Sequence, residues 1–193
     1  MVMKRLKSLF VKERGLKTDE LQKLASLEGQ ERADELHALL YEYAFQNAAR
    51  FVHDELRRHE SPMKDLQRHL FFNEMLVINF WMVEKVFLHY LGSLAVKMHS
   101  HYFGTLPDID ERTVALQNRI KTYNLCWDEF TGHHDEFGLK VGEQLFTIDA
   151  EFPVKQVSFW IISYVDDSLK SFRSIRKQLL DSGLIHRKEN GNG

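Results

Sequence analysis

Apolar residues recur every three to four positions along most of this chain, which is the period of an α-helix with one buried face. Residues 31–59 show the pattern clearly, because Leu36, Leu40 and Phe51 fall on one face of a helix. Asn47 lies inside the same apolar stripe. A buried amide needs a hydrogen-bond partner, so we expect Asn47 to bond to a neighbouring helix.

Prolines and glycines divide the chain into helical segments. Ser61-Pro62 is a helix start, because Ser is favoured at the N-cap and Pro in the first turn. The helix that begins there is apolar nearly all round, which predicts a buried, central helix that Gly92 bends or breaks. The expected helices cover residues 18–27, 31–59, 61–104, 107–132 and 153–181.

The helix expected over 107–132 begins with the strongest start signal in the chain. Asp108 and Glu111 are spaced as in a capping box, in which two side chains bond to the free N–H groups of the first turn. Apolar residues then follow at alternating spacings of four and three, which is typical of a coiled-coil-like seam. The seam consists of Leu116, Ile120, Tyr123, Trp127 and Phe130.

The C-terminal third holds one ambiguous segment and one clear helix end. Residues 137–152 predict a short irregular or hairpin segment, with a partial helix as the alternative. The last helix ends near Asp181, where Gly183 is expected in the left-handed conformation and Leu184 is expected to pack back on the helix.

These segments together predict an all-α, single-domain helical bundle with about four long helices over residues 1–193. Residues 1–15 form a basic N-terminal segment, and residues 188–193 are expected to be a mobile tail. A length of 193 residues suits one domain with a sizeable core. Hydrophobic residues make up 44% and charged residues 28%, which is typical of a globular protein.

Cysteine usage and hydropathy bear on the compartment. Cys126 is the only cysteine, so no internal disulfide forms, and we expect a reducing, cytoplasmic location with Cys126 as a small buried residue. The most apolar stretch, residues 70–98, contains Glu74, Glu84 and Lys85. Charged groups are costly inside a bilayer, so we do not expect a transmembrane helix.

Charge is unevenly distributed although the formal net charge is only −2. Residues 1–15 hold five basic residues against one acidic residue, whereas residues 107–151 hold ten acidic residues against four basic ones. A basic segment with Leu6 and Phe10 can dock on a partner or on an anionic membrane surface. We favour contact with the chain's own acidic region, and we do not expect nucleic-acid binding.

The ten histidines raise the question of a metal site. The sequence contains no Glu-x-x-His and no His-x-x-x-His, so the common helical metal patterns are missing. The densest group of metal-ligating residue types is His133 to Glu136, near the end of the third long helix. A solvated acidic loop is the interpretation that we favour for this group.

The adjacent pair His134-Asp135 resembles the His-Asp pair of the HD-type metal-dependent phosphohydrolases, which are also helical. That family adds an upstream histidine and a downstream aspartate as metal ligands. The resemblance implies a divalent metal that activates a water molecule. The ligands that it implies are His99 or His101, His134, Asp135, and Asp166 or Asp167, with His101 and Asp167 as the chosen pair.

Two further groups of residues have a functional and a structural interpretation. Glu74 and Glu84 lie on the apolar helix, where a buried carboxylate marks an active site unless it pairs with a basic residue or reaches the rim. We expect pairing. Trp81, Trp127 and Trp160 could line a small-ligand pocket between helices, but we expect them to pack in the core.

Local catalytic signatures are missing, because the sequence has no Gly-rich phosphate loop and no Gly-x-Ser-x-Gly. We therefore expect a non-enzymatic bundle with no cofactor that acts through protein contacts, either as a homodimer or as a regulatory or scaffold partner. The alternative is a metal-binding bundle or HD-like phosphohydrolase centred on His133–Glu136.

Overall fold

The computed structural model describes residues 15–127, 134–146 and 154–187, and every regular element in these ranges is an α-helix. This confirms the predicted all-α fold. The helices are α2 (Thr18–Ser26), α3 (Gly29–Arg57), α4 (Arg68–Leu91), α5 (Ala95–Phe103), α6 (Ile109–Cys126), α7 (Asp135–Leu145) and α8 (Val154–Asp181).

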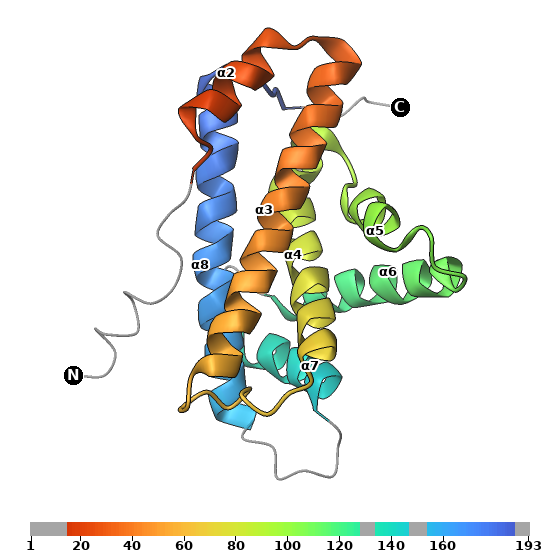
Figure 1. Cartoon of the computed structure of the whole chain (residues 1–193), viewed down its shortest axis with the longest axis vertical. Coiled ribbons are helices and arrows are strands. Elements are labelled where there is room, and N and C mark those ends of the chain that lie inside the picture. The colour runs from red at the N-terminus through yellow and green to blue at the C-terminus, as the bar shows by residue number, and fades with distance from the viewer. Residues whose placement is uncertain (1–14, 128–133, 147–153, 188–193) are drawn as a thin grey trace, which may run out of the picture.

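Three long helices, α3, α4 and α8, run side by side and form the body of the bundle (Figure 1). α7 packs along α8 at one end of this body, and α2 crosses the opposite end. α5 and α6 project sideways from α4 and pack against each other (Figure 1). The fold is therefore a three-helix body with a two-helix arm, and the helices are more numerous than the four long ones expected.

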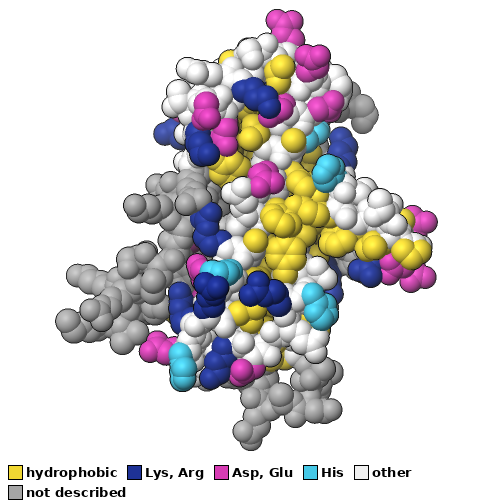
Figure 2. All heavy atoms as spheres, in the orientation of Figure 1, with side chains coloured by type: hydrophobic (Ala, Val, Ile, Leu, Met, Phe, Trp, Pro, Cys, Tyr) yellow, Lys and Arg dark blue, Asp and Glu magenta, His cyan; other side chains and the backbone are white. Residues whose placement is uncertain are grey.

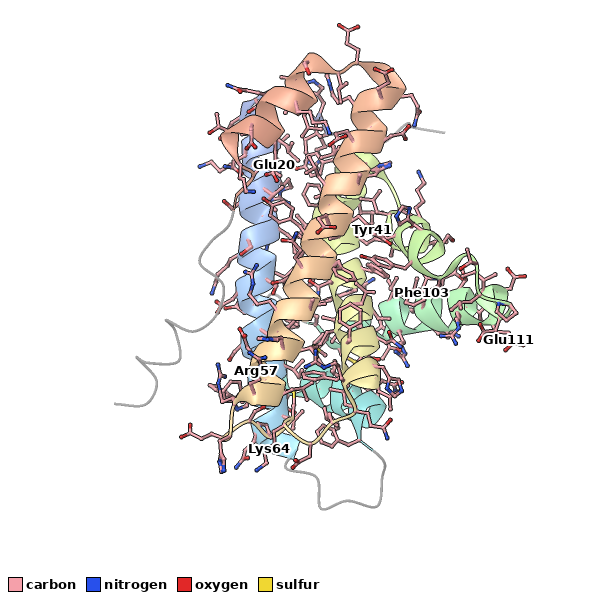
Figure 3. All side chains as sticks on the ribbon, in the orientation of Figure 1. Glu20, Tyr41, Arg57, Lys64, Phe103 and Glu111 are labelled. Carbon is pink, nitrogen blue, oxygen red and sulfur yellow. The ribbon has the colours of Figure 1, made fainter. Side chains whose placement is uncertain are left out.

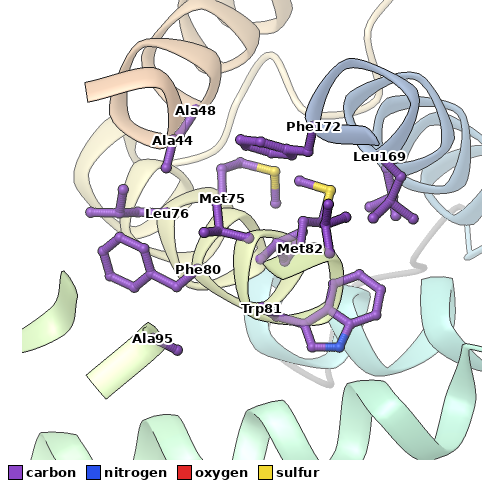
Figure 4. Packing of buried hydrophobic residues seen from close by; sticks show 14 of the residues in the cluster. Ala44, Ala48, Met75, Leu76, Phe80, Trp81, Met82, Ala95, Leu169 and Phe172 are labelled. Carbon is purple, nitrogen blue, oxygen red and sulfur yellow. The ribbon is translucent and has the colours of Figure 1, made fainter. Parts of the chain in front are cut away.

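α4 is the central element, as its uniformly apolar sequence predicts. Small residues on α3, Ala44 and Ala48, let that helix approach one side of α4 (Figure 4). Phe172 of α8 is also buried and lies over α4, between α3 and α8 (Figure 4). Trp81 of α4 is fully buried and points towards the arm. A helix that buries all its faces must lie in the middle of the structure.

A polar network crosses this core at Asn47. Its side-chain amide donates to the Asn79 carbonyl oxygen at 2.9 Å and to the Ser168 hydroxyl at 2.8 Å. The Asn79 amide in turn donates to the Tyr164 hydroxyl at 2.5 Å. The prediction that Asn47 bonds to a neighbouring helix is confirmed, and the bonds fix the register of α3, α4 and α8 relative to one another.

The expected helix over 61–104 is divided, and it begins later than predicted. Residues 61–67 form turns, in which the Ser61 hydroxyl accepts from the Met63 N–H at 3.1 Å and Met63 is fully buried. Burying Met63 takes the chain out of the helical path, so α4 begins at Arg68 and not at Ser61. The predicted break at Gly92 is confirmed by its φ of 80°.

The break at Gly92 is completed by a carboxylate from the same helix. Glu84 accepts hydrogen bonds from the backbone N–H groups of Leu94 and Ala95, at 3.1 and 2.9 Å, and from the Ser93 hydroxyl at 2.9 Å. A carboxylate at a helix N-terminus satisfies free N–H groups and is favoured by the helix dipole. Glu84 therefore caps α5 and sets the angle at which the arm leaves the body.

The ambiguous segment after residue 134 is helical. α7 spans Asp135–Leu145, so the partial-helix alternative is confirmed there and the hairpin is wrong for residues 137–145; residues 147–152 lie outside the described ranges. Gly138 lies so close to α8 that a Cβ on it would be 2.6 Å from the Ser158 Cβ. The close approach of Gly138 to α8 lets this segment pack more tightly as a helix than as a hairpin.

The C-terminal end of α8 is fixed by a hydrogen bond. Gly183 has a φ of 65°, and the Leu184 N–H donates to the Leu179 carbonyl at 2.9 Å, which confirms the predicted C-terminal cap of α8. Residues 1–14 and the tail 188–193 lie outside the described ranges. No helix of the described part is long and apolar enough to span a membrane.

Candidate interaction groove

A hollow of the described surface lies between α3 and α5. α5 packs against α4 and α6 and leans away from α3, which leaves a groove of about 500 Å³. Figure 2 shows apolar side chains gathered in the middle of this face, where the arm meets the body. The groove is lined by Asp34, His37, Ala38, Leu40, Tyr41, Glu42, Leu94, Lys97, Met98, His101 and Tyr102.

Stacked aromatic rings form the floor of the groove. Tyr41 of α3 and Tyr102 of α5 stack with ring centroids 4.2 Å apart, and Phe45 stacks on the other side at 5.3 Å from Tyr102. The His101 ring meets Tyr41 edge-on at 4.5 Å. Figure 3 shows Tyr41 on the side of α3 that faces α5. Both tyrosines are only half-buried, so the stack is available to a partner.

The helical period explains why these residues converge. On α3, Asp34, Ala38, Tyr41 and Phe45 follow spacings of four, three and four, which place them along one stripe. A similar stripe begins at Leu94, the N-cap of α5, and continues along that helix at Met98 and Tyr102. The sequence does not reveal the groove, because the α3 stripe lies beside the core stripe and only the tilt of α5 shows which of the two is covered.

The rim of the groove carries charges of both signs. Asp34 and Glu42 lie on the α3 side, and Lys97 lies on the α5 side, all of them exposed. Burial and the nearby Lys97 charge lower the pKa of His37, which favours its neutral form. Burial raises the pKa of Tyr102 to about 12, so its phenol is neutral at physiological pH. Asp34 and Glu42 outnumber Lys97, so the acidic and lysine side chains of the rim sum to a weakly acidic charge.

The buried carboxylate of Glu74 forms an ion pair with a basic residue of the arm, as expected. Its carboxylate contacts the Arg119 guanidinium and the Tyr123 hydroxyl of α6, and Arg119 also donates to Gln144 of α7 at 2.8 Å. Burial raises the pKa of Glu74, although both partners lower it. The ion pair ties α6 to α4 and α7, which gives Glu74 a structural role.

Glu55 is a second buried carboxylate, which was not among the residues predicted from the sequence. It is fully buried near the end of α3 and receives a hydrogen bond of 2.7 Å from Arg58. Arg58 in turn lies over the Trp160 ring of α8, 4.7 Å from its centroid. Burial raises the pKa of Glu55. The Glu-x-x-Arg spacing was the available signal, because residues three apart share a helix face.

The residues of the metal alternative lie in different surroundings. His101 belongs to the α3–α5 groove, and the His134 ring stacks on Trp127 with centroids 3.8 Å apart. Asp135 is exposed in the first turn of α7, whereas Asp167 of α8 contacts Lys170 at 3.3 Å.

The other residues considered for this alternative are placed as follows. Asp166 also pairs with Lys170, at 2.6 Å, and His99 is buried on α5 beside the Phe103 ring. His133 lies outside the described ranges. Within those ranges, no three His, Cys, Asp or Glu side chains form a group that could hold a metal ion. The metal alternative stays a prediction that metal analysis of the protein tests.

Trp81 and Trp127 pack in the core as expected, whereas Trp160 of α8 is only partly buried against the core. Trp81 and Trp127 are buried against each other and against Phe137 of α7, with centroids 5.0 to 5.7 Å apart. The Trp81 indole N–H donates to Asn124 at 2.8 Å. Cys126, which directly precedes Trp127 in the sequence, is also buried, as predicted.

No family model, curated protein or solved structure matches this chain. The geometry of the groove is therefore the basis for a functional proposal.

Proposed function

We propose that this chain is a non-enzymatic interaction module that binds an amphipathic helix of a partner protein in the groove between α3 and α5. The observation that carries the proposal is the half-exposed stack of Tyr41 on Tyr102 at the floor of that groove. Aromatic residues and Met are enriched in protein interfaces, and Met98 lies beside the stack.

The shape of the groove fits a helix. Two helices that diverge from a common floor leave a space that a third helix can fill with one apolar stripe. α5 has nine residues and is therefore about 13 Å long, which corresponds to two to three turns of a bound helix. A partner with apolar side chains at positions i, i+3 or i+4, and i+7 would place them on the aromatic floor.

The charges at the rim favour one orientation of the partner helix in the groove. Asp34 and Glu42 favour basic residues on the partner's α3-facing edge, and Lys97 favours an acidic residue on the opposite edge. Rim charges act mainly on the rate of association and on orientation, and the aromatic floor supplies the affinity. Self-association through the same groove is the competing form of this proposal, and light scattering separates the two.

The single buried cysteine supports the further proposal that the protein works in a reducing compartment, which for this chain would be the cytoplasm.

A selection from a random peptide library displayed on phage tests the function without knowledge of the partner. The immobilised chain should enrich helical peptides with the i, i+3 or i+4, i+7 apolar spacing. Selected peptides should be lost on the Ala38→Arg chain, in which a long charged side chain enters the groove from an exposed position. Enrichment of peptides that bind both chains equally would contradict the proposal.

A further inference from the structure

His37 of α3 and Lys97 of α5 line the groove from opposite walls. Burial, and then the charge of Lys97, lower the pKa of His37, so the two side chains are close in space. His37 is partly buried and Lys97 is exposed, and neither forms a hydrogen bond or an ion pair with another described residue. The groove therefore presents two nitrogen donors, one on each wall, that a group from outside can bind.

The helical period sets the distance of this pair from the aromatic stack. His37 precedes Tyr41 by four residues on α3, and Lys97 precedes His101 by four residues on α5. The His101 ring meets Tyr41 edge-on at 4.5 Å, so the two helices are in register at that level. A rise of about 1.5 Å per residue places His37 and Lys97 about 6 Å away, towards the start of each helix. Figure 2 shows histidine and Lys or Arg side chains together at the upper edge of the apolar side chains of this face.

The chemistry of this pair fits a carboxylate. One carboxylate oxygen can accept a hydrogen bond from the Lys97 ammonium and the other from the His37 imidazole, because a carboxylate offers acceptors on both sides. Asp34, one turn before His37, is the nearest acidic side chain of the chain itself and repels an anion. Its carboxylate already accepts a hydrogen bond of 2.7 Å from Gln30. The chain thus leaves the acceptor between the two walls to be supplied by the occupant of the groove.

We propose that the partner helix carries an Asp or Glu beside its apolar stripe and that this carboxylate binds between Lys97 of α5 and His37 of α3. The inference rests on the proposed function, because it specifies the chemistry of the helix that occupies the same groove. One turn of a helix rises about 5.4 Å, which is close to the distance between this pair and the stack. The acidic residue is therefore three or four positions away from the apolar residue that covers Tyr41.

A carboxylate in this position makes binding depend on pH, with a definite sign. In the free chain, burial and the Lys97 charge lower the pKa of His37, and Asp34 opposes them. A bound carboxylate raises the pKa of His37, because an opposite charge stabilises the imidazolium form. The complex therefore takes up a proton. The affinity is highest at low pH and falls as the pH rises through the raised pKa of His37.

His37 is separated from the other titratable groups of the groove. Those groups lie about one turn further along it, at the level of the stack: Tyr41, Glu42, His101 and Tyr102. α2 and α4 also pack against α3, and among the described residues they add no charged group that acts on the pKa of His37. The pH dependence should therefore be specific to His37.

Helical peptides selected on the chain from a phage library are the probe. We expect the enriched peptides to share an Asp or Glu at one fixed position, three or four residues from an apolar residue of the stripe. Replacing this acid with its amide should weaken binding to the wild-type chain about fivefold in isothermal titration calorimetry, which is typical of an exposed ion pair. On the Lys97→Gln chain, the same replacement should change the affinity by less than about twofold.

Lys121→Gln is the matched control, because Lys121 is an exposed lysine of α6 outside the groove. On that chain, the replacement of the acid by its amide should keep its effect of about fivefold. The absence of a shared acidic position, or an equal effect on the Lys97→Gln and Lys121→Gln chains, would overturn the inference.

The pH dependence tests the role of His37 with a selected acidic peptide that contains no histidine. The wild-type chain should bind it about fivefold more tightly at pH 5.5 than at pH 8, and the amide peptide should show less than about a twofold change. His37→Gln should remove the dependence, whereas His101→Gln should keep it. Loss of the dependence in His101→Gln and not in His37→Gln would place the carboxylate elsewhere and overturn the inference.

The same selection separates failure of this inference from failure of the proposed function. Helical peptides that are lost on the Ala38→Arg chain but share no acidic position would overturn the carboxylate site and leave the groove as a partner site. A selection without any helical peptide sensitive to Ala38→Arg would contradict the groove as a partner site, and the carboxylate site with it.

Discussion

The Tyr41 ring of α3 stacks on the Tyr102 ring of α5 with planes only 15° apart. The stack is the link between the body of the bundle and its arm at the groove. Replacing Tyr102 with Ala removes the contacts to Tyr41 and to Phe45, and each aromatic pair contributes about 0.5–1.5 kcal/mol beyond area burial. We expect Tyr102→Ala to lower the free energy of unfolding by about 2–3 kcal/mol in urea titrations.

Tyr102→Phe is the matched control, because it keeps the ring and removes only the hydroxyl. It should remain within about 1 kcal/mol of the wild type. Equal stability of the Ala and Phe variants would show that the stack does not hold the arm.

The Asn47 network should be among the most sensitive positions of the core. Asn47→Ala leaves the Asn79 carbonyl oxygen and the Ser168 hydroxyl without their donor, and each buried group left unpaired costs about 1–3 kcal/mol. We expect a loss of about 2–4 kcal/mol in the free energy of unfolding. Gln46→Ala, one residue earlier and exposed, should change it by less than about 0.5 kcal/mol. Similar losses at both positions would argue against the network.

Gly138 tests the close packing of α7 on α8. In an ordinary helix, Gly→Ala stabilises by about 1 kcal/mol. Here the new Cβ would lie 2.6–2.8 Å from atoms of Ser158, so we expect Gly138→Ala to destabilise by about 1–3 kcal/mol. In thermal unfolding, Ser158→Gly should recover part of the loss when it is combined with Gly138→Ala, which a double-mutant cycle detects. A stabilised Gly138→Ala protein would mean that the two helices are further apart.

The ion pair of Glu74 predicts a pH dependence with a definite sign. Burial raises the pKa of Glu74 in the folded state above its ordinary value of 4.5. The folded protein therefore holds this proton more tightly than the unfolded chain does. The resulting stability is fully present below pH 4.5 and is lost as the pH rises through the raised pKa.

Glu74→Gln removes this titration and keeps a side chain that can accept from Arg119 or Tyr123. Relative to the wild type, the Gln variant should therefore gain stability as the pH rises from 4.5 to 8, measured by urea unfolding at both values. Glu111→Gln, at an exposed position of α6, should show no such change. A wild-type to Gln difference that is the same at both pH values would contradict the raised pKa.

The sequence predicted local structure better than it predicted the site. Local patterns predicted the buried α4, the break at Gly92, the need of Asn47 for a hydrogen-bond partner and the Gly183 cap, because residues close in sequence carry each of these signals. The start of α4 and the helix α7 were missed or left open because tertiary packing decides them, through burial of Met63 and the approach of Gly138 to Ser158. The groove depends on the angle between α3 and α5, and a sequence pattern does not contain that angle.

The affinity of a selected helical peptide for two matched variants tests most directly whether the groove between α3 and α5 is the binding site. Ala38→Arg fills the groove, whereas Ala115→Arg makes the same change at an exposed position of α6 outside it. We predict that Ala38→Arg weakens binding at least tenfold in isothermal titration calorimetry and that Ala115→Arg leaves it within twofold of the wild type. Equal affinities for the two variants would contradict the assignment of the groove as the interaction site.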